Sequence, residues 1–268
     1  MPTQVTPARP QRLFGISYSP WTEKARWALE HHGIPYTFSE HTPLIDELPM
    51  RLRLRKLRGS ISVPSLLTDG GPVQGSLAIA RWADANGHGA LLERADERAA
   101  VDAWDARAER AFEAGRALYS ARLRSTPGAL EDAVPAFVPE PLRRTVGRIG
   151  VAFIARKYGV DYQAEAVHEA TLAEVLTALR RALAEAASQS GGALRYVVGG
   201  HFTLADIVAA CAVNVVVPVG SQYVPIRPRT REAWTRTALA LEFGDVISWR
   251  DALYARHRRD GAGPSLVA

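Results

Sequence analysis

SYSPWTEKARWALEHHGIPY, residues 17–36, decides how the fold begins. Ser19 stands directly before Pro20, the order expected when a serine is a helix N-cap and a proline occupies the first turn. Apolar residues then recur at helical spacing, at Trp21, Ala25, Ala28 and Leu29. Gly33 ends the run. The stretch predicts a helix whose first hydroxyl serves either as a cap or as a chemical group at the positive end of the helix.

Short strand patterns flank this helix and extend the same unit. RLFGIS (12–17) reads as a buried strand and YTFSEH (36–41) as an alternating one, so the chain opens as β-α-β with a right-handed crossover between parallel strands. A basic segment at 50–58 follows, as a short helix or irregular structure. SVPSLLTDGGPVQG (62–75) predicts two strands around an Asp-Gly-Gly turn, and SLAIARWADAN (76–86) predicts a further helix.

The chain becomes helical after Glu93. A long Ala-, Arg- and Glu-rich helix comes first, with an apolar stripe of Trp104, Ala108, Phe112 and Leu118 or Tyr119. A loop with four prolines at 126–141 separates it from helices predicted at 142–158, at 163–188, after His201 and over 229–258. We therefore predict an α/β unit over 12–90 and an all-α unit over 93–258, with flexible tails at 1–11 and 259–268.

Composition and charge limit the class of protein. The 268 residues are 47% hydrophobic and 23% charged, the balance of a soluble globular protein. The net charge is +5, concentrated at 51–58, where we expect a solvated face or a rim for a small anion, because no nucleic-acid motif accompanies it. No apolar run approaches the roughly 20 residues that span a bilayer, and the N-terminus lacks a secretory signal. These features predict a cytoplasmic protein without a membrane or nucleic-acid partner.

The single cysteine restricts the chemistry further. Cys211 alone excludes an intramolecular disulfide, a Cys-based metal site and a redox pair. It lies on the apolar helix opened by Thr203 and Asp206, which together form a capping box, and we expect an inert core thiol. The seven histidines are scattered without the spacing of a zinc helix, so we expect no metal.

Two further segments carry chemistry with more than one interpretation. Val63-Pro64 is either the start of an edge strand or a cis proline that leaves the preceding backbone free for a peptide-like ligand. In Gln74-Gly75-Ser76, the serine is a good N-cap, and a helix start with free N–H groups also binds a carboxylate. For Ser76, capping the helix and binding a carboxylate are compatible roles.

Five motifs in order resemble the glutathione transferase superfamily over about residues 12–257. They are SPWTEKARWALEHHGIPY (19–36, similar to the first helix of the tau and omega classes), VPSLL (63–67), GSLAIARWAD (75–84), FTLADI (202–207) and EFGDVISWRDALYARHR (242–258). The resemblance implies an α/β thioredoxin-like N-terminal domain followed by an all-α C-terminal helical domain.

The resemblance also implies a mechanism with glutathione as co-substrate. The backbone of Val63, freed by a cis Pro64, would pair with the cysteine of glutathione, and Ser76 with Gln74 and Gly75 beside it would hold the γ-glutamyl end. Ser19 would donate a hydrogen bond to the thiolate and lower the thiol pKa, acting as a stabiliser and not as a nucleophile. A small apolar electrophile would lie between the domains, against Trp21, Phe112, Arg116 and Tyr119.

Two departures from the family pattern matter. Gly75 stands where the family has a glutamate facing the γ-glutamyl ammonium, a loss of roughly 1.5–3 kcal/mol unless Gln74 or a partner subunit's acid (Asp102 or Asp105) replaces it. A homodimer is implied by the family alone. Ser19 in place of a cysteine argues against omega-like thiol transfer, and leaves conjugation, as in detoxification, or glutathione-dependent peroxidase activity. The alternative is a non-catalytic ligand- or protein-binding member of the same fold.

Overall fold

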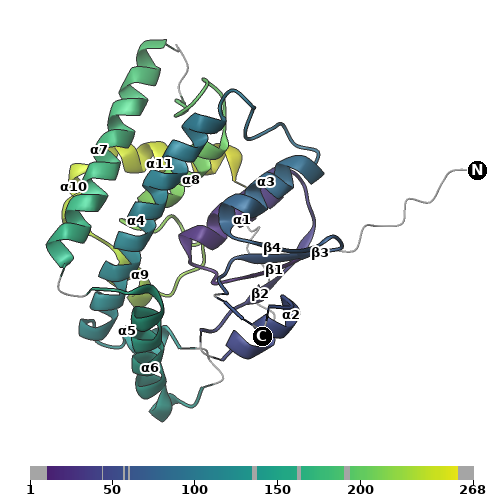
Figure 1. Ribbon diagram of the computed structural model, residues 1–268. Coiled ribbons are helices and arrows are strands. Elements are labelled where there is room, and N and C mark those ends of the chain that lie inside the picture. Colours follow the sequence, from purple (N-terminus) through teal and green to yellow (C-terminus); the bar gives the residue numbers. More distant parts are fainter. Residues whose placement is uncertain are drawn as a thin grey trace, which may run out of the picture.

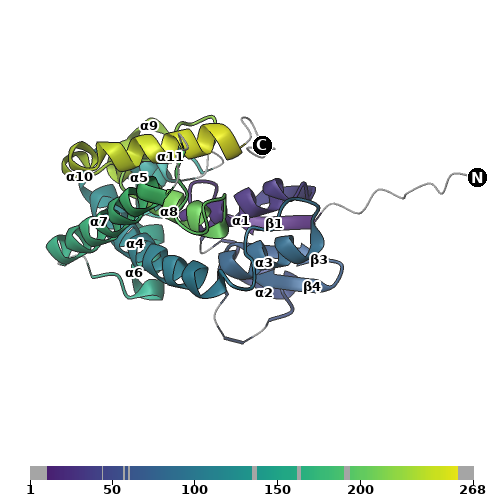
Figure 2. The same cartoon turned by 90° about the horizontal axis from the view of Figure 1, so that it is seen from above.

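The structure is a computed structural model that describes residues 11–43, 45–56, 58–59, 61–134, 138–161, 164–189 and 194–258. A four-stranded sheet with its helices occupies one side of the molecule, and a bundle of helices occupies the other (Figures 1 and 2). This is the predicted fold class, an α/β unit followed by an all-α unit. The predicted tails at 1–11 and 259–268 lie outside the described residues, except for Gln11.

The sheet confirms the predicted β-α-β opening. Its strands are β1 (Gln11–Gly15), β2 (Tyr36–Glu40), β3 (Ser65–Thr68) and β4 (Gly71–Gln74), in the order β2-β1-β3-β4. β1 and β2 are parallel, with α1 (Pro20–His31) as the crossover. β3 pairs antiparallel with β1 and with β4, around the predicted turn at Asp69-Gly70. The basic segment forms α2 (Glu47–Arg53), and α3 (Ser76–Asn86) follows β4.

The two faces of the sheet bury different helices. Side chains alternate along a strand, so neighbouring Leu13 and Phe14 point to opposite faces. Leu13 belongs to the main core, which contains α1 and α3, whereas Phe14 packs with Met50 and Leu54 of the α2 side. Figure 1 shows α1 and α3 together on one side of the sheet and α2 on the other. Covering both faces keeps β1 in the centre of the unit.

The helical half begins with α4, whose predicted apolar stripe is buried. The helices are α4 (Arg98–Ser125), α5 (Ala129–Asp132), α6 (Glu140–Tyr158), α7 (Glu165–Gln189), α8 (Leu204–Asn214), α9 (Pro228–Trp234), α10 (Thr237–Glu242) and α11 (Gly244–His257). Two details of the prediction are wrong. The expected loop at 126–141 contains the short α5, and the helical run expected over 229–258 is divided among three helices. The first break follows α9, where the N–H of Arg236 bonds to the carbonyl of Val216 instead of continuing the helix.

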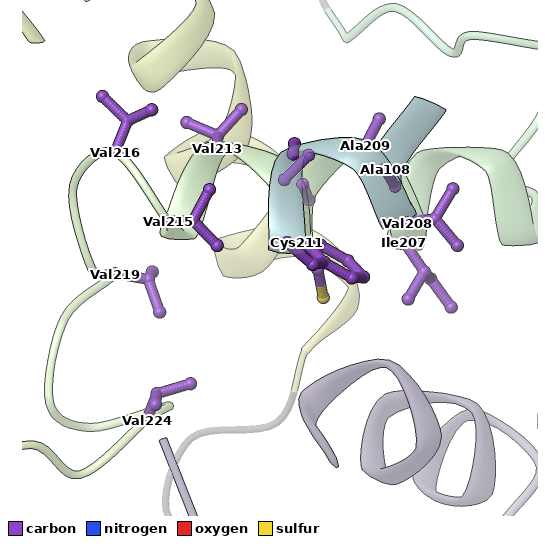
Figure 3. Close-up of a cluster of buried hydrophobic side chains, with 14 of the residues drawn as sticks. Ala108, Ile207, Val208, Ala209, Cys211, Val213, Val215, Val216, Val219 and Val224 are labelled. Atoms are coloured by element: carbon purple, nitrogen blue, oxygen red, sulfur yellow. The ribbon is translucent and has the colours of Figure 1, made fainter. Parts of the chain in front are cut away.

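The centre of the helical half is α8. Figure 3 shows Cys211 surrounded by alanine and valine side chains from α8 and the segment after it. The thiol is completely buried, as expected for a core thiol, and burial raises its pKa well above the usual value. The capping box is also confirmed: the Asp206 carboxylate accepts hydrogen bonds from the backbone N–H of Thr203 (2.8 Å) and from its hydroxyl (2.9 Å).

Buried ion pairs fix α1 between the two halves. The ammonium of Lys24 is fully buried and lies 2.5 Å from Asp105 and 2.9 Å from Glu109 on α4. Glu23 accepts a hydrogen bond from Arg258 at 2.8 Å, at the end of α11. Breaking such a pair leaves an uncompensated buried charge, so the position of α1 is strongly specified. Among the described helices, none combines the length and the apolar character required to cross a membrane.

Candidate functional site

A cleft of about 790 Å³ lies where the two halves meet. Its walls come from the start of α1, the segment after β2, the strand entrance at Val63-Pro64, the start of α3, the middle of α4, most of α6 and Trp234 of α9. The cleft therefore draws on segments from the α/β unit and from the helical unit. Most of the predicted site residues line it: Ser19, Trp21, Val63, Pro64, Gln74, Gly75, Ser76, Arg116 and Tyr119.

Ser19 is the N-cap residue of α1, with extended backbone angles (φ −76°, ψ 132°). Its carbonyl accepts the N–H of Glu23, but its side chain makes no capping hydrogen bond. Ser19 lines the cleft at the positive end of the helix, and its hydroxyl is not engaged in capping. Of the two roles open from the sequence, the side-chain cap is absent and the chemical role remains available.

Val63-Pro64 is a cis peptide bond, which is the second of the two interpretations. The sheet ladder ends at Ser65, one residue after the proline. Within the described part of the chain, the backbone N–H and C=O of Val63 have no hydrogen-bond partner. The carbonyl of Pro64 accepts the N–H of Gly75 at 3.0 Å, which joins the strand entrance directly to the start of α3.

Gly75, not Ser76, is the N-cap residue of α3, which corrects the capping role assigned to the serine. Its φ of 92° and ψ of 141° lie in a region that residues with a side chain rarely adopt, so the glycine provides this turn without strain. Ser76 is the first helical residue and is buried beside the cleft. Gln74 does not offer a free carbonyl, because its Oε1 accepts a hydrogen bond from Lys56 at 3.2 Å.

Three of the four residues predicted for the electrophile wall line the cleft. Trp21, Arg116 and Tyr119 line the cleft, whereas Phe112 is fully buried behind Trp21, with the two ring centroids 5.1 Å apart. Trp21 covers Phe112 because its indole N–H donates to Glu109 at 2.6 Å, which holds the ring across α4. Phe112 therefore supports the wall and does not form it.

Asp105 cannot serve a neighbouring subunit, because it is buried against Lys24. Asp102 lies 2.5 Å from Arg81, which lines the cleft. Among the described residues, no cluster of three or more His, Cys, Asp or Glu side chains is arranged to hold a metal ion.

Sequence reasoning missed the polar side chains that α4, α6 and the segment after β2 bring to the cleft. Glu109, Glu113 and Ser120 recur at helical spacing with the predicted Arg116 on α4, which is the signal that could have found them. His41 is 6% exposed, its Nδ1 has no partner among the described residues, and burial lowers its pKa. Lys157 of α6 reaches Glu47 of α2 at 3.1 Å, across the cleft mouth.

Family comparisons agree with both halves of this architecture. The model of the glutathione S-transferase N-terminal domain matches residues 18–86, and that of the glutathione S-transferase C-terminal domain matches residues 169–238. Together these matches span just over half of the chain, and the chain belongs to the glutathione S-transferase superfamily. No curated protein matches it.

Solved structures show the same fold at low sequence identity. The glutathione transferase GSTFuA2 from Phanerochaete chrysosporium has 19% identity and a TM-score of 0.63, covering 94% of this chain and 100% of its own. A glutathione S-transferase from Methylobacterium radiotolerans, in complex with glutathione sulfonate, has 20% identity and a TM-score of 0.54, covering 97% and 96%. At these identities the likeness establishes the fold alone.

Proposed function

We propose that this protein is a glutathione transferase that joins the glutathione thiolate to an electrophilic carbon of a small, largely apolar acceptor. One observation carries the proposal. Ser19, whose side chain makes no capping hydrogen bond, lines one cleft together with Val63, whose backbone has no hydrogen-bond partner among the described residues, and with Ser76 at the start of α3. In the reaction, the thiol proton passes to solvent, the new sulfur–carbon bond forms, and the leaving group departs with the electron pair of the bond that breaks.

Ser19 acts on the thiolate and forms no bond to the acceptor. Its hydroxyl donates a hydrogen bond to the sulfur, and the positive end of α1 favours the negative charge, so the pKa of the bound thiol falls. A lower pKa increases the fraction of thiolate, which is the nucleophile. The cysteine backbone of glutathione pairs with Val63, and the γ-glutamyl carboxylate occupies the start of α3 at Ser76.

The remaining expectations belong to the same proposal. Peroxidase chemistry is a second reaction of the same thiolate, in which the sulfur attacks a hydroperoxide oxygen and a second glutathione completes the disulfide. We also propose that the protein forms a homodimer, is cytoplasmic and acts in detoxification. The domain limits 12–90 and 93–258 likewise stay predictions.

The alternative is a non-catalytic member of the fold that binds ligands or a protein. Two observations favour it: Gly75 offers no acid to the ammonium of glutathione, and Lys56 occupies the carbonyl of Gln74. Both weaken the γ-glutamyl site. A protein that holds an apolar ligand in the cleft without binding glutathione would have this arrangement.

Calorimetry of glutathione binding, combined with conjugation of 1-chloro-2,4-dinitrobenzene, tests the proposal. We expect binding and turnover, and we expect Ser19→Ala to raise the pKa in the pH–rate profile and to lower kcat, while Ser19→Thr keeps part of the activity because it keeps a hydroxyl. Circular dichroism checks that each variant is folded. An unchanged pKa and rate in Ser19→Ala would remove Ser19 from the mechanism, and the absence of glutathione binding would favour the non-catalytic alternative.

A further inference from the structure

Arg116 differs from the cations Arg81 and Lys157 of the cleft because it forms no ion pair within the described residues. It projects from α4 into the wall where the acceptor is proposed to bind. Its guanidinium lies 3.9 Å from the ring centroid of Tyr158 on α6 and 4.9 Å from that of Trp21 on α1. Aromatic rings from two other helices therefore hold this cation in the cleft.

The nearby acids do not neutralise this arginine. Glu109 already accepts hydrogen bonds from Trp21 and Lys24. Glu113 is exposed and forms no ion pair among the described residues. By contrast, the other cations of the cleft are engaged, Arg81 with Glu93 and Lys157 with Glu47. Among these three cations of the cleft wall, Arg116 therefore lacks an acidic partner within the described residues.

Two further donors on the same wall are also unsatisfied. The Nε atom of Arg116 and the indole Nε1 of Trp234 are buried without a hydrogen-bond partner in the described residues. Trp234 stacks on Tyr119 with 4.4 Å between ring centroids, and both rings line the cleft. Buried donors without partners are rare in native proteins, and an acceptor group of a bound ligand or an ordered water would satisfy them.

We propose that the acceptor carries a carboxylate or a comparable planar anion, and that Arg116 binds this group and determines the acceptor specificity. The proposal rests on the proposed transferase function, whose acceptor site it describes. Arginine presents two parallel N–H groups that match a carboxylate, and the contacts with two rings restrict the position of the guanidinium before the ligand arrives. The apolar body of the acceptor then lies against the side chains of α6, such as Val146 and Ile154.

A matched pair of acceptors tests this inference. Glutathione is assayed with 4-chloro-3,5-dinitrobenzoate and with its methyl ester, which share the reacting carbon and the chloride leaving group and differ in the anion. We expect the ratio of kcat/KM, carboxylate over ester, to fall about tenfold or more in Arg116→Gln, because a hydrogen bond to a charged group is lost. Arg116→Lys keeps the positive charge but loses the two parallel N–H groups, so we expect its ratio to lie between those of the wild type and Arg116→Gln. The control Glu113→Gln removes a nearby negative charge and keeps or increases the ratio.

A binding measurement without thiol separates this inference from the transferase proposal. Quenching of tryptophan fluorescence reports the binding of 3,5-dinitrobenzoate and of its methyl ester to the wild type and to Arg116→Gln. If neither chloride is turned over but the carboxylate binds in preference and Arg116→Gln removes that preference, the transferase proposal fails and the anion site stands. A ratio and a preference that are the same in the wild type and in Arg116→Gln overturn the inference, whether or not the protein is active.

Discussion

Replacing Gly75 by glutamate restores the acid that the family pattern places before Ser76, and its effect on glutathione binding can be worked out from the turn. The residue has a φ of 92° and a ψ of 141°, and a Cβ added there meets no atom within 4 Å. The side chain therefore has room, and the cost is confined to the backbone. A non-glycine residue held in a sparsely populated region costs about 1–3 kcal/mol of stability.

The binding gain has a different origin. A carboxylate facing the ammonium of glutathione forms a charge-assisted hydrogen bond, worth about 1.5–3 kcal/mol. Gly75 is half-buried, and Lys56 on Gln74 competes for the new charge, so the lower end applies, which is about tenfold in Kd. Gly75→Gln is the matched control, because it has the same backbone cost and no charge.

Urea denaturation and calorimetry of glutathione binding measure the two effects separately. We expect both variants to lose about 1–3 kcal/mol of unfolding free energy, and only Gly75→Glu to bind glutathione more tightly than the wild type. If Gly75→Glu binds no more tightly than Gly75→Gln, the missing acid is not what limits the site. If Gly75→Gln is as stable as the wild type, the conformational argument for glycine at this position is wrong.

Two further predictions concern stability. Asp206→Ala removes the acceptor of the backbone N–H groups of Thr203 and Val197, so we expect the free energy of unfolding in urea to fall by about 2–5 kcal/mol. Asp206→Asn should lower it less. A fall below about 1 kcal/mol in Asp206→Ala would contradict the capping role. Burial lowers the pKa of His257 from 6.5 to about 4, so the unfolded chain binds the proton first and stability falls as pH decreases from about 6.5 towards 4. His257→Phe keeps the ring on Phe202 (4.0 Å) and should flatten this part of the thermal-stability profile against pH, whereas an unchanged slope would assign the effect to other groups.

The elements that could be predicted are those whose causes are local in sequence. The serine-proline pair and the apolar spacing after it define α1, and the alternation around the Asp-Gly turn defines β3 and β4. The break between α9 and α10 has a tertiary cause, because the N–H of Arg236 bonds to Val216, twenty residues earlier in the chain. The sequence pattern within 229–258 carries no sign of this contact, so it predicts an unbroken helical run there.

The sequence predicted which residues lie near the site, but not how deeply each is buried or what it contacts. Periodicity placed Phe112 and Arg116 on one face of α4, four residues apart, but not their depth. Trp21 covers Phe112 because its indole is held by Glu109, so one residue of the face is core and the other lines the cleft. In the same way, the sequence shows a glycine at 75 without showing the sign of its φ.

The charges at the two ends of the cleft are related. At the α3 end, Gly75 removes an acid and Lys56 bonds to Gln74, so this end favours a carboxylate over an ammonium. At the α4 end, Arg116 presents a second cation without a partner in the described residues. A ligand with anionic groups at both ends and an apolar middle matches this distribution. A glutathione conjugate of an acidic acceptor has that form, so we expect such a conjugate to bind more tightly than glutathione itself, and product release to become slower as the acceptor site is better filled.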